Sequence, residues 1–90
     1  MQIRFFATYR DITLTKSIEV PAPETVRGLL ELLCKKYGKT MREKLFLPDG
    51  SLSYDAIILV NGRHITHLDG IDTRLSDADT VSIFPMIAGG

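Results

Sequence analysis

One long amphipathic helix pattern constrains the fold more than any other feature of this chain. Thr25 stands directly before apolar residues at three-and-four spacing, namely Val26, Leu29, Leu30, Leu33 and Tyr37. This spacing places them on one face of an α-helix, with Thr25 as N-cap and Gly38 suited to a left-handed helix end. Because such a helix must bury its apolar face against another element, the rest of the chain has to supply a matching apolar surface.

The segments before the helix have the patterns of strands. Residues 2–8 alternate, which predicts a strand whose buried face carries Ile3, Phe5 and Ala7. A shorter alternating run at residues 17–20 follows a polar bend at residues 10–13. The two strands are therefore expected to form an antiparallel hairpin.

Two short elements are expected directly after the helix. Residues 40–43 read Thr-Met-Arg-Glu, which has capping-box spacing and predicts a second, short helix. Residues 47–50 read Leu-Pro-Asp-Gly, which predicts a turn.

The last third of the chain returns to strand patterns. Residues 56–60 are continuously apolar, and Asn61-Gly62 is a favoured hairpin turn that leads to a short strand at residues 64–65. Residues 68–79 are mostly turn residues. Residues 80–84 alternate again, which predicts a final strand with Val81 and Ile83 on one face.

This order of elements predicts an α+β fold, a mixed sheet of four to five strands with one main helix packed across one face. If the first and last strands are central neighbours, the helix covers four of their side chains together, Ile3, Phe5, Val81 and Ile83. On the same strands Phe6 and Phe84 break the alternation, because both fall on the polar side. They are then expected to meet on the sheet face opposite the helix.

Composition narrows the class of protein. A chain of 90 residues fits one domain, and eleven Lys plus Arg balance eleven Asp plus Glu, so its net charge favours neither nucleic acid nor an anionic membrane as a partner. The single cysteine cannot form an internal disulfide, and no apolar run approaches the ~18 residues of a membrane span. A cytoplasmic location is expected.

Several motifs together resemble the small subunit of molybdopterin synthase. They are Val-Asn-Gly at residues 60–62, the stretch at residues 68–85 and the terminal Ala-Gly-Gly. Those subunits belong to the ubiquitin-like sulfur carriers, which have the β-grasp fold. The resemblance implies a β-grasp domain at residues 1–85 and a flexible tail at residues 86–90. Ala78-Asp79 and Met86 depart from the residues that this family often has at those positions.

The resemblance also implies a chemistry for the C-terminus. In that family an E1-like adenylating enzyme uses ATP and magnesium to activate the terminal carboxylate, here that of Gly90. A persulfide donor then supplies the sulfur of a thiocarboxylate. Gly89 lets the chain thread a narrow channel, because glycine has no Cβ. The large subunit of the synthase carries the catalytic groups, so this chain is expected to bind no cofactor of its own.

A partner-binding surface is expected where the tail begins. The resemblance and the alternation agree on the sheet face that carries Phe6 and Phe84, where exposed aromatic residues would mark a docking site. The residues expected to bind partners are Phe6, Phe84, Pro85, Met86, Ile87 and Ala88.

Other functions stay open at this point. The same activated glycine serves protein modifiers that conjugate to lysines, a thiamine sulfur carrier is a weaker alternative, and the Gly-Gly end could be idle on a plain interaction module. Cys34 is expected to be a packed thiol rather than a sulfur relay, and His64 and His67 are not expected to bind a metal. The aspartates at positions 69, 72, 77 and 79 are expected to serve turns.

Overall fold

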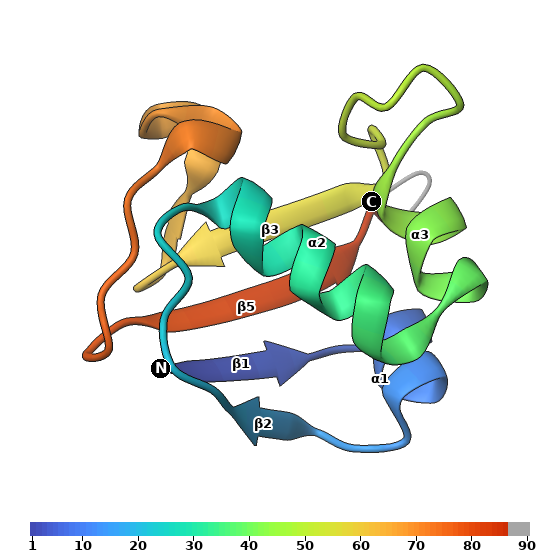
Figure 1. Ribbon diagram of the computed structural model, residues 1–90, viewed down its shortest axis with the longest axis horizontal. Coiled ribbons are helices and arrows are strands. Elements are labelled where there is room, and N and C mark those ends of the chain that lie inside the picture. The colour runs from blue at the N-terminus through green and yellow to red at the C-terminus, as the bar shows by residue number, and fades with distance from the viewer. Residues whose placement is uncertain (87–90) are drawn as a thin grey trace.

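The computed structural model describes residues 1–86 and contains a five-stranded sheet with the order β2-β1-β5-β3-β4 (Figure 1). The strands are β1 (Gln2–Phe5), β2 (Ser17–Glu19), β3 (Ala56–Val60), β4 (Arg63–His64) and β5 (Thr80–Pro85). β1 and β5 pair in parallel, and the other neighbours are antiparallel, so the sheet is mixed. The first and last strands are central neighbours, which meets the condition set out in the sequence analysis, and the α+β prediction is confirmed.

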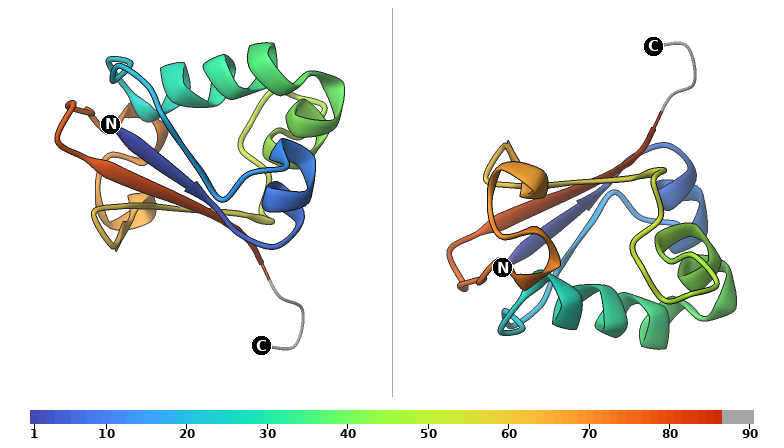
Figure 2. Two further views of the ribbon diagram at one scale, coloured as in Figure 1. Left: turned by 90° about the horizontal axis from the view of Figure 1, so that it is seen from below. Right: turned by 90° about the horizontal axis from the view of Figure 1, so that it is seen from above.

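The main helix, α2 (Val26–Tyr37), crosses one face of this sheet (Figure 2). The Thr25 hydroxyl accepts a hydrogen bond from the backbone N–H of Gly28 at 3.4 Å, which confirms the predicted N-cap. Gly38 ends the helix at φ +85°, a region that favours glycine, but its ψ of −157° lies outside the left-handed helical region. The remaining helical elements are α1 (Thr8–Thr13), α3 (Lys39–Leu45) and two short 3₁₀ turns, η1 (Ile65–His67) and η2 (Gly70–Asp72).

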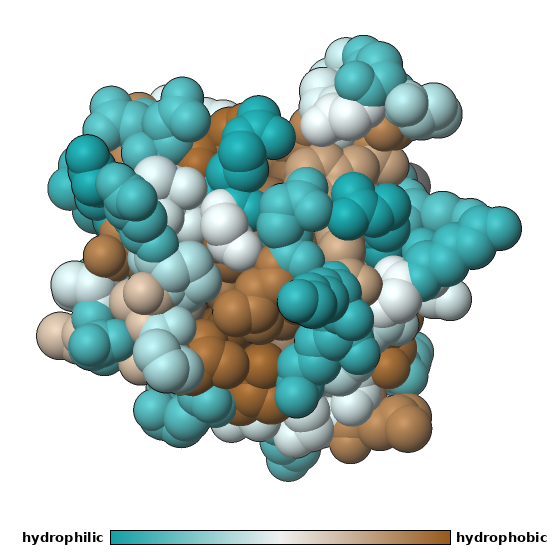
Figure 3. Space-filling model, viewed as in Figure 1, coloured by the Kyte–Doolittle hydropathy of each residue, from teal (hydrophilic) through white to brown (hydrophobic). Residues whose placement is uncertain are grey.

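The surface on the α2 side is polar over the helices. Figure 3 shows hydrophilic residues over much of α2 and α3, with hydrophobic surface mainly between α2 and the β1–β2 edge of the sheet. Half-buried Ile18 and Val20 from this edge pack against the core. Within residues 1–86, no helix has both the length and the apolar character that crossing a bilayer requires.

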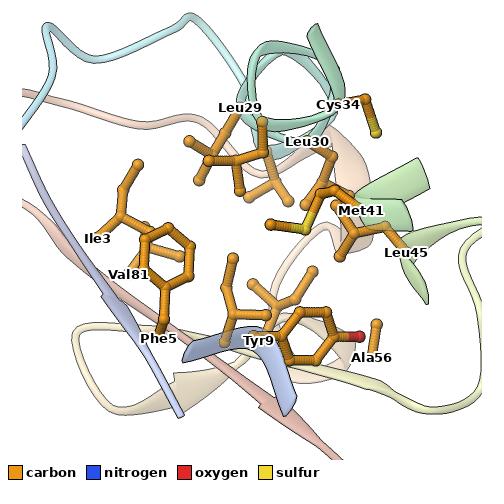
Figure 4. Packing of buried hydrophobic residues seen from close by; sticks show 14 of the residues in the cluster. Ile3, Phe5, Tyr9, Leu29, Leu30, Cys34, Met41, Leu45, Ala56 and Val81 are labelled. Carbon is orange, nitrogen blue, oxygen red and sulfur yellow. The ribbon is translucent and has the colours of Figure 1, made fainter. Parts of the chain in front are cut away.

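The core fills the space between the sheet and the helices (Figure 4). The four strand residues expected beneath the main helix are each at most 1% exposed, namely Ile3, Phe5, Val81 and Ile83. Tyr9 from α1 and Met41 from α3 close one end of this core, and the Tyr9 hydroxyl donates to the Lys44 carbonyl at 3.2 Å. Burial, with a smaller contribution from Asp55, raises the pKa of Tyr9 to about 12.

The prediction of a first strand that continues to Thr8 is wrong. β1 ends at Phe5, Ala7 turns the chain at φ +51°, and α1 begins at Thr8. Tyr9, Ile12 and Thr13 have helical spacing and face the interior, so burial of Tyr9 favours a helical turn over a longer strand. The residues read as a polar bend thus belong to a short helix.

Two further boundaries differ from the sequence predictions. α3 follows Gly38 directly and has no side-chain cap, so Thr40 lies inside the helix and the capping box is wrong, although the helix is confirmed. Gly38 at positive φ both ends α2 and starts α3, which leaves no room for a separate cap. Ile65 belongs to η1 rather than to a strand, because His64 Nδ1 accepts from the Thr66 N–H at 3.1 Å and starts the turn.

The predicted turns are confirmed and are held by side-chain hydrogen bonds. Asn61 and Gly62 both have positive φ, at 51° and 83°, as the hairpin turn requires. Asp79 accepts from Asn61 Nδ2 and from the Ser76 N–H, each at 2.8 Å, and these bonds lower its pKa. Asp77 accepts from the Ala22 N–H at 2.8 Å. Asp79 therefore serves the turn as predicted, whereas Asp77 links this connection to the segment before α2.

Candidate functional site

The end of β5 brings the chain to its C-terminal residues. Pro85 lies opposite Ala56 in the sheet, and the Met86 N–H donates to the Asp55 carbonyl at 2.8 Å. The backbone is thus held as far as Met86, whose side chain is 54% exposed. The other predicted site residues, Ile87, Ala88, Gly89 and Gly90, lie outside the described residues, as does most of the predicted tail.

Beside this strand end Phe6 and Phe84 form a stacked pair. Their ring centroids are 4.4 Å apart and their planes differ by 17°. The parallel register places Phe5 beside Ile83, and the Phe6 N–H, directly after β1, donates to the Ile83 carbonyl at 3.1 Å. The side chains of Phe6 and Phe84 therefore lie on the face opposite to those of Phe5 and Ile83. Both rings are half-buried. The predicted meeting of the two aromatics is therefore present in the fold.

Two neighbours of this pair were not among the predicted site residues. Ile57 lies opposite Phe84 in the β3–β5 register and is half-buried on the same face. The Arg4 guanidinium lies 5.4 Å from the centre of the Phe6 ring. The continuous apolar run of β3 was a signal for Ile57, because it puts apolar residues on both faces. An isolated arginine in a strand gives no comparable signal for Arg4.

The cysteine and one of the histidines considered in the sequence analysis have roles in the fold. Cys34 is 4% exposed within the core, and burial, partly offset by Arg42, raises the pKa of its thiol. His64 caps η1 through its Nδ1 atom. In residues 1–86, no three His, Cys, Asp or Glu side chains gather closely enough to hold a metal ion.

Two known proteins are similar to most or all of this chain in sequence. Small archaeal modifier protein 3 of Haloferax volcanii is 39% identical over 92 residues, which cover 100% of this chain and 98% of that protein. A putative sulfur carrier protein of Archaeoglobus fulgidus is 40% identical over 74 residues, or 81% of this chain and 83% of its own.

A solved structure and a family model point to the same group of proteins as these relatives. The solution structure of small archaeal modifier protein 1 from Methanosarcina acetivorans superposes with a TM-score of 0.81 at 29% identity, covering 99% of this chain and 94% of that one. The sequence model of the ThiS family matches residues 3–90. The chain belongs to the ThiS family, whose members have the ubiquitin-like β-grasp fold described above.

Proposed function

We propose that this protein is a sulfur carrier whose working group is the α-carboxylate of Gly90. The observation that carries the proposal is the family match, which runs through residue 90 and so includes Ala88-Gly89-Gly90. A C-terminal carboxyl has an ordinary pKa of about 3.3–3.7 and is an unreactive carboxylate at neutral pH. It therefore needs activation before it can accept sulfur.

The activation has two steps, both on a partner enzyme. The carboxylate attacks the α-phosphorus of ATP, whose phosphates are bound to magnesium. Pyrophosphate is released, and the product is an acyl adenylate. The terminal sulfur of a persulfide then attacks the carbonyl and AMP leaves. A thiol cleaves the resulting acyl disulfide, which yields the thiocarboxylate and a disulfide. The E1-like adenylating enzyme supplies the nucleotide site, so this chain has only to present its C-terminus.

The described residues support such a presenting role. β5 is held to the sheet until Met86 by the bond to Asp55, and the stacked Phe6 and Phe84 lie beside the point where the chain leaves the sheet. Aromatic side chains that remain partly accessible are favoured anchors for a protein partner. A partner seated on this pair would be close to the residues that continue toward Gly90.

The destination of the sulfur is proposed to be molybdopterin. This chain would be the small subunit of the synthase, and the large subunit would hold the catalytic groups that transfer the sulfur. The support is the resemblance of residues 60–62 and 68–85 to those small subunits. In the structure these segments form the hairpin turn, the turn-rich connection and β5, which together lead to the C-terminus.

Protein modification is the second candidate, and a specific observation favours it. A relative that matches from end to end is named a modifier protein, as is the protein in the similar solved structure. In that case the activated carbonyl group of Gly90 is transferred to a lysine amine rather than to sulfur, and an isopeptide bond forms. The activating step would be the same for both candidates.

Intact mass spectrometry separates these possibilities. The full chain is incubated with an adenylating enzyme, ATP, magnesium and a persulfide donor, after a first spectrum has established the mass of the untreated chain. The sulfur-carrier proposal expects a mass increase equal to the replacement of one oxygen by sulfur, located on Gly90 by fragmentation. A Gly90→Phe variant is the control and should remain unchanged.

The opposite results are equally clear. If no cognate adenylating enzyme produces the sulfur shift, the sulfur-carrier proposal is wrong. Mass added to lysines of lysate proteins, in place of the sulfur shift, would favour the modifier. Addition of the large synthase subunit and a molybdopterin precursor should consume the thiocarboxylate, and failure to do so would contradict the molybdopterin destination.

A further inference from the structure

A basic hollow lies on the open sheet face beside the aromatic pair. Its volume is about 310 Å³ and its walls come from β1, α1 and the start of β2, with lining residues Gln2, Arg4, Phe5, Phe6, Arg10, Lys16 and Ser17. A second depression of about 350 Å³ adjoins it and shares Arg10 and Lys16, with Leu14 in its wall. Figure 1 shows why these segments meet, because α1 lies at the end of β1 and leads directly to β2.

The positive charges of the hollow lack carboxylate partners within the described chain. The salt bridges among residues 1–86 join Lys39 to Glu43, Arg42 to Glu31 and Arg74 to Glu24. None of these involves Arg4, Arg10 or Lys16. The nearest carboxylates by position are Asp11 in the second depression and Glu19 beside Gln2 in the sheet, and neither lines the hollow itself.

This excess of charge is local. The whole chain has a formal net charge of zero, yet the hollow gathers three cationic side chains and no acidic one. Electrostatic potentials of opposite sign on two protein surfaces speed their association and align the partners. The hollow therefore fits an acidic surface.

Leu14 is a second, independent feature of this region. Its side chain is 87% exposed, and its backbone has φ 60° and ψ 22°, the left-handed conformation that glycine or asparagine usually provides at this position. Its N–H donates to the Arg10 carbonyl at 2.8 Å, so the turn itself needs no leucine side chain. A non-glycine residue in this sparsely populated backbone region is the kind of outlier from which a functional contact can be inferred.

We propose that the basic hollow and Leu14 bind an acidic segment of the enzyme that activates the C-terminus. The segment carries Asp or Glu side chains for Arg4, Arg10 and Lys16, next to an apolar side chain that packs against Leu14. The identity of this partner rests on the proposed function, whereas the chemistry of the segment rests on the hollow alone.

Continuity of the surface supports a single partner. Phe6 lines the hollow and also stacks on Phe84, and the Arg4 guanidinium lies over the Phe6 ring. A partner seated on the aromatic pair would thus cover the hollow as well. Guanidinium groups bind carboxylates through two parallel hydrogen bonds, and stacking on a ring leaves their N–H edge available.

The exposed leucine argues for a protein segment rather than a nucleic acid. Phosphate binding would use the cations but would leave Leu14 without a role. A segment that alternates acidic and apolar residues uses both features. The acidic protein segment is therefore the occupant that accounts for all of these side chains.

A peptide titration tests this chemistry without any enzyme. The ¹⁵N-labelled full chain is titrated with a synthetic peptide that alternates Glu and Leu, while the amide resonances are followed by NMR. We expect shifts at Arg4 and at residues 10–16, which weaken as salt is added. A variant with Arg10→Glu and Lys16→Glu should bind about tenfold more weakly or worse, since like charges then face each other.

The matched control carries the same change of net charge elsewhere. Arg27 and Lys35 are exposed on α2, which covers the opposite face of the sheet, and a variant with Arg27→Glu and Lys35→Glu should bind the peptide as the natural chain does. Thermal unfolding of each variant checks that α1 survives. Equal weakening in both variants would show a general charge effect and overturn the site.

Two other results would also count against the proposal. A single-stranded oligonucleotide or inorganic phosphate that causes the same shifts at lower concentration would assign the hollow to a phosphate ligand. Leu14→Gly should weaken peptide binding while the thermal midpoint stays the same or rises. If this variant binds as tightly as the natural chain, the apolar half of the proposal is wrong.

The activating enzyme then connects the site to the proposed function. If the enzyme converts the natural chain and requires about tenfold more of the Arg10→Glu, Lys16→Glu variant for the same rate, the partner assignment is supported. Equal rates for the two chains would overturn that assignment and leave the sulfur-carrier proposal intact. If no enzyme converts even the natural chain, the proposed function fails, and the peptide titration alone decides the binding chemistry.

Discussion

The two faces of the central strands differ in what their side chains do. On the face under α2, Phe5 and Ile83 are at most 1% exposed and belong to the core. On the other face, the very next residues, Phe6 and Phe84, stack on each other and remain half-buried. β5 and the segment formed by β1 and Phe6 thus provide both surfaces, because successive side chains alternate between the faces.

This difference separates side chains that stabilise the fold from side chains that remain accessible to a partner. An aromatic side chain that is buried beneath a helix contributes to folding through the area it removes from water and its packing contacts. An aromatic side chain on the open face keeps part of its surface for another molecule. Substitutions at adjacent positions should therefore have different consequences, and the following predictions test that contrast.

The largest effect is expected on the covered face. Phe5→Ala should lower the free energy of unfolding by about 3–5 kcal/mol, because it removes a buried ring and leaves a cavity beside Tyr37, whose ring lies 6.0 Å away. Urea denaturation measures this loss. A decrease below about 1 kcal/mol would mean that the covered face tolerates cavities and that the contrast with the open face is weak.

A smaller effect, of a different kind, is expected on the open face. Phe84→Ala should weaken binding to the activating enzyme by about 1–3 kcal/mol, the usual range for an aromatic anchor, with little loss of folding stability. Calorimetric titration and urea denaturation of the same variant measure the two quantities. Unfolding like that of Phe5→Ala, with unchanged binding by the folded fraction, would assign Phe84 to the core.

Leu14 extends the comparison to the edge of the open face. Leu14→Gly removes a left-handed leucine but gives the unfolded chain more freedom, so the free energy of unfolding should stay the same or rise by up to about 1 kcal/mol. Thermal and urea unfolding measure the change. A clear loss of stability would show that the exposed side chain supports the fold after all.

The smallest effect is expected at Asp79, where the polar groups of the turn satisfy one another. Bonds from Asn61 and the Ser76 N–H hold the folded pKa of Asp79 below its ordinary value of about 3.9. The stability that this carboxylate contributes is complete above that ordinary pKa and is lost as the pH falls through the lowered one.

Asp79→Asn provides the measurement. The natural chain and the variant are unfolded in urea at neutral pH and at about pH 3, and the variant should lose less stability on acidification. Other carboxylates titrate in both chains and cancel in the comparison. An identical loss in the two proteins would show that the bonds to Asp79 do not stabilise its charged form in the fold.

The elements that could be predicted from sequence are those with a local signal. The stripe of α2 and its Thr25 cap, the positive-φ turn at Asn61-Gly62 and the alternation of β5 each depend on residues a few positions apart. Helical and strand periodicities can be read without knowledge of the rest of the molecule. The α+β class followed from them, since one apolar helix face requires one sheet face.

The tertiary structure decided what depends on distant contacts. Burial of Tyr9 made α1 a helix where the alternation predicted a strand, and Gly38 took the place of the expected cap of α3. Ile57 lies beside the aromatic pair because the β3–β5 register places it opposite Phe84.

The basic hollow is the clearest case of this second kind. Arg4, Arg10 and Lys16 come from a strand, a helix and a loop, and as single charges in the sequence they predict nothing. They share one hollow because α1 turns the chain back beside β1, and the turn depends on packing of Tyr9 in the core. Local periodicity determined the elements of this protein, whereas long-range packing determined which exposed side chains meet.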